Sequence, residues 1–235
     1  MITSMILAVT AWAAATPVPV VFDKEFSAIQ PLVGVWEFVA DPSRPKPGGT
    51  SLPSVAPQLM VRGDRWTVGP EAGIAARLSA LFKGLPETML DQVKAYYYFP
   101  LALLKNREFT DGDRSVEIMP VSGKVDQAGG IAFGMVDPAS YWVLRLNANE
   151  NNVMLFEYVK ARRESRFRYT ATLVSGHWYT LTARIAGKRL TALLEGKFLF
   201  YYDLPRPVSG KLGLWSKADS VTRFRRFVLS PHAPA

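Results

Sequence analysis

Cysteine is missing from the 235-residue chain, and histidine occurs only twice, as His177 and His232. The lack of cysteine excludes a disulfide framework, a thiolate metal site and a cysteine nucleophile. Two histidines are too few for a zinc site built from several imidazoles. A serine–histidine–aspartate triad would have to use one of these two side chains. These absences leave carboxylate, amide, basic and aromatic side chains as the candidates for function.

Met1–Ser4 contains no lysine or arginine, although the apolar stretch that follows has the length of the central region of a signal peptide. This stretch, Met5–Ala15, is too short to span a bilayer, which requires about 20 apolar residues. Ala13 and Ala15 form a small-residue cleavage site. We therefore expect residues 1–15 to be a signal peptide, no transmembrane segment, and a secreted or periplasmic protein. An apolar N-terminal strand is the alternative.

Positive charge is concentrated in the second half of the chain. Residues 1–120 hold 11 basic and 12 acidic side chains, whereas residues 121–235 hold 17 basic and 8 acidic ones. A basic domain can meet anionic polymers such as acidic polysaccharide, or its charge can act only on solubility. Nucleic acid is not an expected partner, because the chain has no recognition motif and carries an export signal.

Short segments rich in β-branched and aromatic residues follow one another from Arg107 to Leu229, separated by turn-forming residues. Both faces of Val153–Val159 are apolar, which indicates a central strand of a two-sheet sandwich. Asp137–Ser140 predicts a hairpin turn, and Trp66–Val68 predicts a short strand. Hydrophobic residues make up 49% of the chain, enough for one large core. We predict an all-β, two-sheet jelly-roll sandwich that forms a single domain over residues 16–235.

Residues 71–94 break this pattern, because their apolar side chains recur at helical spacing. These side chains are Ile74, Leu78, Leu81, Phe82, Leu85, Met89, Leu90 and Val93. We expect a short helical insertion near residues 71–94. It either packs locally over one end of the sandwich or presents an apolar face to a partner.

Three segments in the second half of the chain carry the strongest signal. Gly123–Ile131 reads GKVDQAGGI, Tyr141–Val153 reads YWVLRLNANENNV, and Gly213–Thr222 reads GLWSKADSVT. Together they resemble the concanavalin A-like jelly-roll domain of the 3-keto-disaccharide hydrolases, or more loosely the family-16-glycosidase-like domain, of secreted bacterial proteins. The resemblance covers about residues 108–229. It implies a concanavalin A-like lectin/glucanase fold and carbohydrate as the partner.

The residues in these segments suggest how a sugar would be held. Arg145 and Asn147 share one face of a strand, and their guanidinium and amide groups offer directional donors to hydroxyl groups. Lys217 can add a further donor. Trp142 and Trp215 are candidates for stacking on the apolar face of a pyranose ring. The alternative is structural: an arginine–glutamate pair that holds two strands in register, and a tryptophan packed in the core.

Three carboxylates are candidates for catalysis, namely Glu150, Asp126 and Asp219. Glycoside hydrolysis needs two carboxyl groups about 5–5.5 Å apart for retention, or about 6.5–9.5 Å apart for inversion. The Glu-x-Asp-x-x-Glu strand of family-16 glucanases does not occur in the sequence. The structural alternatives are an Asp126 that caps its turn and an Asp219 that closes its loop on backbone N–H groups.

Calcium is the one metal that the sequence leaves open. Asp126, Asp137, Asn147 and Asp219, with backbone carbonyls, could supply some of the six to eight oxygen atoms that Ca²⁺ requires. No Asp-x-Asp-x-Asp calcium-binding loop is present. We therefore expect no cofactor and no metal site, with a calcium ion as the alternative.

Three functions follow from these observations. The first is an exported protein that engages carbohydrate and hydrolyses glycosides or 3-keto-glycosides. The second is a lectin-like module that binds glycans without cleaving them. The third is a structural envelope protein whose cleft is closed by residues 71–94. The basic run Lys160–Arg168 adds anionic glycan as a candidate partner, or forms a solvated outer face. We expect a monomer.

Overall fold

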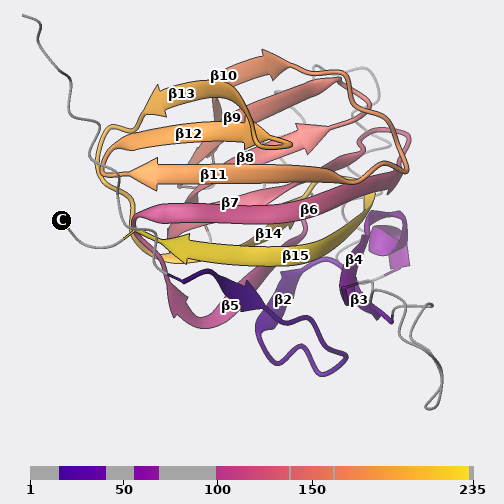
Figure 1. The fold of residues 1–235 in the computed structure, drawn as a ribbon. Coiled ribbons are helices and arrows are strands. Elements are labelled where there is room, and N and C mark those ends of the chain that lie inside the picture. The colour runs from indigo at the N-terminus through magenta and orange to yellow at the C-terminus, as the bar shows by residue number, and fades with distance from the viewer. Residues whose placement is uncertain (1–15, 41–55, 69–98, 138, 161, 233–235) are drawn as a thin grey trace, which may run out of the picture.

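The computed structural model describes residues 16–40, 56–68, 99–137, 139–160 and 162–232. These residues form two antiparallel β-sheets packed face to face (Figure 1). The only helix among them is a single 3-10 helix of six residues, η1. The described part of the chain therefore contains no helix that is long and apolar enough to cross a membrane.

Two long strands form the centre of the eight-stranded sheet. β6 (Gly112–Ser122) and β15 (Val221–Pro231) each have 11 residues and pair with one another. Beyond β6 the sheet continues with β11 (Tyr179–Ala186), β12 (Arg189–Leu194) and β13 (Lys197–Asp203). On the other side of the sheet, β15 pairs with β4 (Gln58–Arg62), which is followed by β3 (Trp36–Val39), and also with β1 (Val18–Val20). Buried and less buried residues alternate along β6, because successive side chains of a strand point to opposite faces.

The seven-stranded sheet lies behind it in Figure 1. Its order is β10 (Arg162–Thr170), β9 (Asn152–Val159), β8 (Ser140–Asn147), β7 (Ala128–Asp137), β14 (Lys211–Ser216), β5 (Leu101–Glu108) and β2 (Ile29–Val33). β10 through β7 follow one another as hairpins. β14 then pairs with both β7 and β5, so that residues far apart in the sequence meet in the middle of the sheet.

The main apolar core fills the space between the sheets. Val116 and Ile118 of β6 belong to the same buried cluster as Leu144 and Leu146 of β8. A second buried cluster includes Tyr141 and Val143 of β8 and members of β5, β7, β9 and β14. Because these residues alternate with core residues along the same strands, they lie on the outer face of the seven-stranded sheet.

The predicted all-β, two-sheet sandwich is confirmed. Val153 and Leu155 of β9 belong to the inter-sheet core, whereas Met154, Phe156 and Tyr158 belong to the outer cluster, as the two-sided apolar pattern predicted. The turn predicted at residues 137–140 joins β7 to β8, where Asp137 and Ser140 pair. The boundaries of most strands agree with the turn signals in the sequence.

One strand prediction is wrong. Trp66–Val68 belongs to η1 (Gly63–Val68) and not to a strand. The backbone N–H of Gly63 donates to the carbonyl of Ser220, and Asp64 folds back to accept hydrogen bonds from Arg62. These local contacts turn the chain away from the sheet. The expected signal peptide at residues 1–15 and the expected insertion at 71–94 lie outside the described residues.

A glycine where β14 meets β5 provides a test of this packing. A Cβ atom on Gly213 would lie 2.0 Å from the carbonyl oxygen of Ala102, so Gly213→Ala forces two backbones apart. We expect the free energy of unfolding to fall by about 3 kcal/mol, measured as a lower midpoint in urea. The control is Gly196→Ala, which meets no atom within 4 Å but keeps φ at +71°, and which should cost only about 1 kcal/mol. Equal midpoints for the two variants would contradict this packing.

Candidate functional site

The three segments that carry the sequence resemblance meet at one end of the sandwich. Asp126 lies in the loop between β6 and β7, Asn147 ends β8, and Lys217 and Asp219 lie in the turn between β14 and β15. Glu150 lies in the turn between β8 and β9. Hydrogen bonds and ion pairs join these residues and their neighbours into two adjoining polar groups, which together we call the loop-end network.

Asp219 closes the β6–β7 loop from a distance of more than 90 residues along the chain. Its carboxylate accepts hydrogen bonds from the backbone N–H groups of Lys124 at 2.7 Å, Val125 at 3.1 and 3.2 Å, and Asp126 at 3.0 Å. Three successive N–H groups of this kind form a concave site for an anion. Both oxygens of Asp219 therefore act within the protein, which is the structural role that the sequence left open.

Asp126 is almost completely buried, with 1% of its surface exposed. Asn147 Nδ2 donates to its Oδ1 at 2.7 Å, and Lys217 Nζ lies 3.3 Å from its Oδ2. The carbonyl oxygen of the Asn147 side chain accepts from the backbone N–H groups of Gln127 and Asn149. Each of the three resemblance segments thus supplies one member of a buried Asp–Asn–Lys cluster.

Burial shifts both charged members of this cluster toward their neutral forms. It raises the pKa of Asp126 to about 7, and the charges of Glu150 and Asp219 act in the same direction. The nearby Arg145 and the hydrogen bond from Asn147 oppose this rise. Burial also lowers the pKa of Lys217 to about 8. Removing water from a charged group disfavours its ionised form, whichever sign it carries.

Arg145 and Glu150 form the second half of the loop-end network. Arg145 Nη2 donates to Glu150 Oε2 at 2.7 Å, and Nη1 donates to Asn152 Oδ1 at 3.1 Å. Asn152 Nδ2 donates in turn to Glu150 Oε2 at 2.9 Å. Burial pushes the pKa of Glu150 upward, but the Arg145 guanidinium and these hydrogen bonds hold it below its ordinary value. The trio fixes the β8–β9 hairpin across its turn.

The two candidate tryptophans lie on opposite faces of the seven-stranded sheet. Trp142 belongs to the core between the sheets, where its ring centroid is 5.9 Å from that of Tyr202. Trp215 is fully buried on the outer face and stacks on Phe99 with centroids 5.4 Å apart. Both rings therefore contact protein side chains, and their roles as sugar platforms stay predictions.

A cavity lies toward the opposite end of the same sheet. It has a volume of about 580 Å³ and is lined mainly by β2, β5 and the end of β7. Its polar lining includes Gln30, Lys105, Asn106, Arg107, Glu108, Asp137 and Lys211; its apolar lining includes Leu32, Leu103, Met135 and Val136. We call it the arch cavity.

An irregularity in β5 shapes the arch cavity. Leu103 pairs with Gly213 and Glu108 pairs with Lys211, so residues 104–107 stand opposite a single residue of β14. Asn106, within this arch, has a φ of 51°, which asparagine tolerates better than most residues. The arch exposes Lys105, Asn106 and Arg107 beside the sheet. These residues were not expected from the sequence, because the arch arises from the register of β5 against β14.

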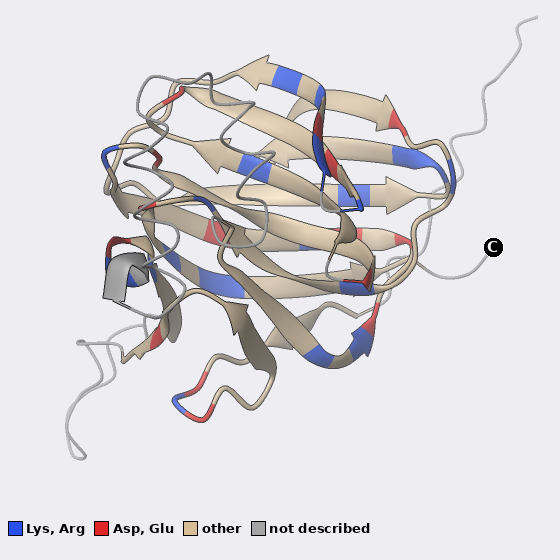
Figure 2. Ribbon diagram, turned by 180° about the vertical axis from the view of Figure 1, so that it is seen from behind, with Lys and Arg blue, Asp and Glu red and all other residues tan. Residues whose placement is uncertain are grey.

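A smaller cavity of about 270 Å³ adjoins the β7–β8 hairpin. Tyr141, Trp142, Glu157 and Arg206 contribute to its lining. Val136, with 72% of its surface exposed, lines this cavity and the arch cavity. Of the eight catalytic and ligand-binding candidates, Trp142 lines the smaller of these two cavities, while the other seven belong to or adjoin the loop-end network. In Figure 2, which views the molecule from this side, basic and acidic residues are interspersed.

The fold resembles that of the carbohydrate-binding module CBM66 from Bacillus subtilis. The TM-score is 0.51, with 16% sequence identity over 55% of this chain and 80% of that one. A β-glucanase of Bacillus licheniformis has a TM-score of 0.43, with 10% identity over 57% of this chain and 72% of that one. A galectin of Caenorhabditis elegans has a TM-score of 0.41, with 16% identity over 53% and 85%. No protein-family model matches the sequence, and no curated protein sequence matches it.

The chain is therefore a two-sheet antiparallel sandwich that resembles the concanavalin A-like lectin and glucanase fold. The expectation of carbohydrate as a partner is a matter of function that the fold alone does not decide. Of the possible calcium ligands, Asp126, Asn147 and Asp219 come together in the loop-end network, while Asp137 lies at the other end of β7. No group of three or more acidic, histidine or cysteine side chains that could hold a metal occurs among the described residues.

The pKa of Asp126 predicts how pH acts on stability. Because its pKa is 3.8 in the unfolded reference and about 7 in the fold, the folded state binds the proton more tightly, and this contribution to stability is lost as pH rises through that range. Asp126→Asn cannot ionise at this position, so the variant does not lose this contribution to stability as pH rises. We expect the free energy of unfolding of the variant, relative to the wild type, to increase by on the order of 3 kcal/mol between pH 4 and pH 7, measured by urea unfolding.

Asp203→Asn is the control for this experiment. Asp203 is exposed, and its hydrogen bonds with Arg189 lower its pKa, so the variant should lose stability relative to the wild type as pH rises. The two variants are thus expected to show difference profiles of opposite sign. A flat profile for Asp126→Asn would show that Asp126 ionises in the fold as readily as in the unfolded chain.

Proposed function

We propose that this protein binds carbohydrate without cleaving it, and that the arch cavity is the binding site. The observation that carries the proposal is that every carboxylate offered by the resemblance segments is engaged inside the protein. Asp219 holds the β6–β7 loop, Asp126 is buried against Asn147 and Lys217, and Glu150 is held by Arg145. A hydrolase needs a carboxyl group that reaches a glycosidic oxygen and another that reaches the anomeric carbon or its water.

The arch cavity has the size and chemistry that a sugar requires. Its volume of about 580 Å³ falls within the usual range for small-molecule sites, roughly 300–1,000 Å³. Gln30 and Asn106 offer amide groups that both donate and accept, while Lys105 and Arg107 offer donors. Leu32 and Val136 supply exposed apolar surface for the C–H face of a sugar ring. Hydroxyl groups can therefore be paired from several directions.

Two further observations support a carbohydrate partner. The CBM66 module, whose fold this chain resembles, is a carbohydrate-binding module by its name. The 3-keto-disaccharide-hydrolase-like segments form one connected unit in the structure, since Asn147 and Lys217 both contact Asp126. We also propose that the protein is exported through residues 1–15, which would place it where glycans of the cell envelope occur.

Binding at the arch cavity is testable with two exposed positions. We expect a neutral oligosaccharide from a panel built of glucose, galactose and fructose to bind, measured by isothermal titration calorimetry. Asn106→Gly removes the amide but keeps the positive φ that the backbone needs. Arg107→Ala removes the guanidinium. Each variant should weaken binding about tenfold, the loss expected for one or two hydrogen bonds.

Lys24→Ala serves as the control, because Lys24 is 80% exposed and does not line the cavity. It should bind as the wild type does. If the oligosaccharide binds equally well to Asn106→Gly, Arg107→Ala and the wild type, the site lies elsewhere. If no sugar of the panel binds or raises the melting temperature, carbohydrate binding at this cavity is refuted.

Hydrolysis is the second candidate function, and one observation favours it. Burial raises the pKa of Asp126 to about 7, whereas Arg145 holds that of Glu150 below its ordinary value. Two carboxyl groups whose environments separate their pKa values are typical of a general acid paired with a base or nucleophile. In this scheme Asp126 would be the general acid that protonates the glycosidic oxygen, and Glu150 would be the ionised carboxylate that acts as the base or nucleophile. The substrate would be a glycoside or a 3-keto-glycoside.

A product assay decides between the two functions. The protein is incubated with disaccharides and 3-keto-glycosides, with and without divalent metal ions, and the mixture is chromatographed. We expect the sugars to stay intact, because Asp126 is 1% exposed and Glu150 is paired. Cleavage by the wild type that disappears in both Glu150→Gln and Asp126→Asn, but persists in Asp203→Asn, would instead establish the hydrolase.

A further inference from the structure

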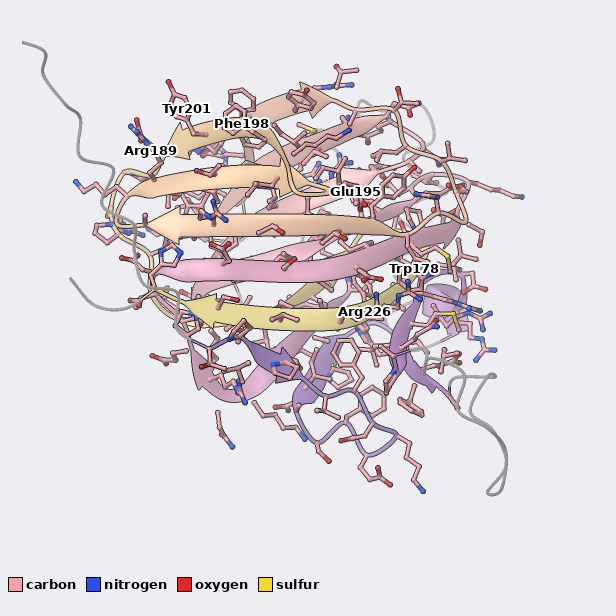
Figure 3. The ribbon with its side chains drawn as sticks, in the orientation of Figure 1. Trp178, Arg189, Glu195, Phe198, Tyr201 and Arg226 are labelled. Carbon is pink, nitrogen blue, oxygen red and sulfur yellow. The ribbon has the colours of Figure 1, made fainter. Side chains whose placement is uncertain are left out.

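The outer face of the eight-stranded sheet carries two exposed aromatic rings that the sequence would place on opposite faces. Phe198 and Tyr201 of β13 are three residues apart, with 59% and 57% of their surfaces exposed. Phe198 pairs with Leu193 and Phe200 pairs with Ala192, so Leu199 is an extra residue at a β-bulge. The bulge shifts the alternation by one position. Both rings consequently lie on the solvent side, as Figure 3 shows.

Hydroxyl groups occupy the strands next to these rings. Tyr201 pairs with Thr191 of β12, which pairs with Arg184 of β11. Phe198 pairs with Leu193, which pairs with Thr182, and the hydroxyl groups of Thr182 and Ser115 of β6 are 2.9 Å apart. Paired residues share a face of the sheet. The hydroxyl groups of Thr191, Thr182 and Ser115 therefore form a diagonal row on this face, with Leu193 between Phe198 and Thr182.

A third aromatic ring lies across the sheet from the first two. Trp178 precedes β11, and the guanidinium carbon of Arg225 lies 4.0 Å from the centroid of its ring. Arg225 and Arg226 both donate to the carboxylate of Glu117. Figure 3 shows Trp178 and Arg226 at one side of the sheet and Tyr201, Phe198 and Arg189 at the other.

Two arginines of this face are more exposed to solvent than the acidic residues with which they pair. The side chains of Arg184 and Arg226 are 48% and 55% exposed, whereas their partners Asp113 and Glu117 are only 21% and 15% exposed. Arg189 lies 5.0 Å over the ring of Tyr201. It is 59% exposed and pairs with the exposed Asp203. Because a guanidinium has five donors and these ion pairs use only some of them, the outward N–H groups can bind a further anion.

We propose that this face is a second binding surface and that its ligand is an acidic polysaccharide. The aromatic rings stack on the sugar units, the hydroxyl row contacts their hydroxyl groups, and the exposed arginines pair with carboxylate or sulfate groups along the chain. From β13 to β6 the surface crosses three strand spacings, or about 14 Å. It is open rather than a pocket, which suits several units of an extended polymer. The proposal does not rest on the arch cavity.

The test compares two acidic sugars, one neutral sugar and one polyanion that is not a sugar. Binding of the full-length protein to tetragalacturonate, to a sulfated dextran oligosaccharide, to neutral dextran and to single-stranded DNA is measured by calorimetry at about 150 mM salt. We expect one of the two acidic sugars to bind and neutral dextran not to bind. Which acidic sugar binds identifies carboxylate or sulfate as the recognised group. Tyr201→Ala and Phe198→Ala should each weaken this binding about tenfold.

Matched controls separate a specific surface from general attraction to a basic protein. Val21→Ala truncates a side chain that is 62% exposed on another part of the surface. Arg189→Gln removes an arginine of this face that is 59% exposed and paired with Asp203. Its control is Arg65→Gln, which removes an arginine elsewhere that is 50% exposed and paired with Glu37. Of the two arginine variants, only Arg189→Gln should weaken binding of the acidic sugar, and Val21→Ala should leave it unchanged.

Three results would overturn the proposal. One is the absence of binding to either acidic sugar. Another is that Arg189→Gln and Arg65→Gln weaken binding of the acidic sugar equally while Tyr201→Ala has no effect. This result would show that the net charge of the protein alone attracts the sugar. The third is tighter binding of DNA than of either sugar. The variants at Asn106 and Arg107 should leave this binding unchanged, so the outcome is independent of the arch cavity.

Discussion

The contact between Asp219 and the β6–β7 loop determines how this end of the molecule is built. A single carboxylate collects three successive backbone N–H groups, from Lys124 to Asp126, and so ties the turn after β14 to the loop before β7. These three hydrogen bonds hold the β6–β7 loop in one conformation. With the loop fixed, the side chain of Asp126 is directed at Lys217, which lies only two residues before Asp219.

This arrangement buries an acid and a base at the edge of an apolar face, at an energetic cost. Bringing Asp126 and Lys217 out of water disfavours both charges, and a pair of this kind stabilises a fold only when its remaining hydrogen bonds are satisfied. Asn147 satisfies one oxygen of Asp126 and, through its own carbonyl oxygen, two backbone N–H groups. The residues that resemble a catalytic constellation are thus also those that fix the geometry of three loops. This structural demand gives a physical reason for the sequence pattern that these segments share with the domain they resemble.

Local sequence rules predicted much of the fold but only part of the site. Alternation along β9 depends on neighbouring residues, and it correctly placed Val153 and Met154 on opposite faces. The loop-closing role of Asp219 was among the alternatives because a carboxylate readily accepts hydrogen bonds from backbone N–H groups. The burial of Lys217 could not be predicted, since lysine is ordinarily solvated. Nor could the bulge at Leu199 or the arch of β5, because each arises from the register of one strand against another.

These two irregularities distinguish the two proposed binding surfaces from the regular sandwich around them. A regular β5 would continue its pairing with β14 and leave no cavity at residues 104–107. A regular β13 would turn Phe198 into the core or Tyr201 away from solvent, since residues three apart point to opposite faces. In both cases one sheet gives up ladder hydrogen bonds to present side chains outward. Strand irregularities are frequent next to binding and active sites for this reason. The arch and the bulge lie on different sheets, so the two proposed binding sites are separate surfaces of the molecule.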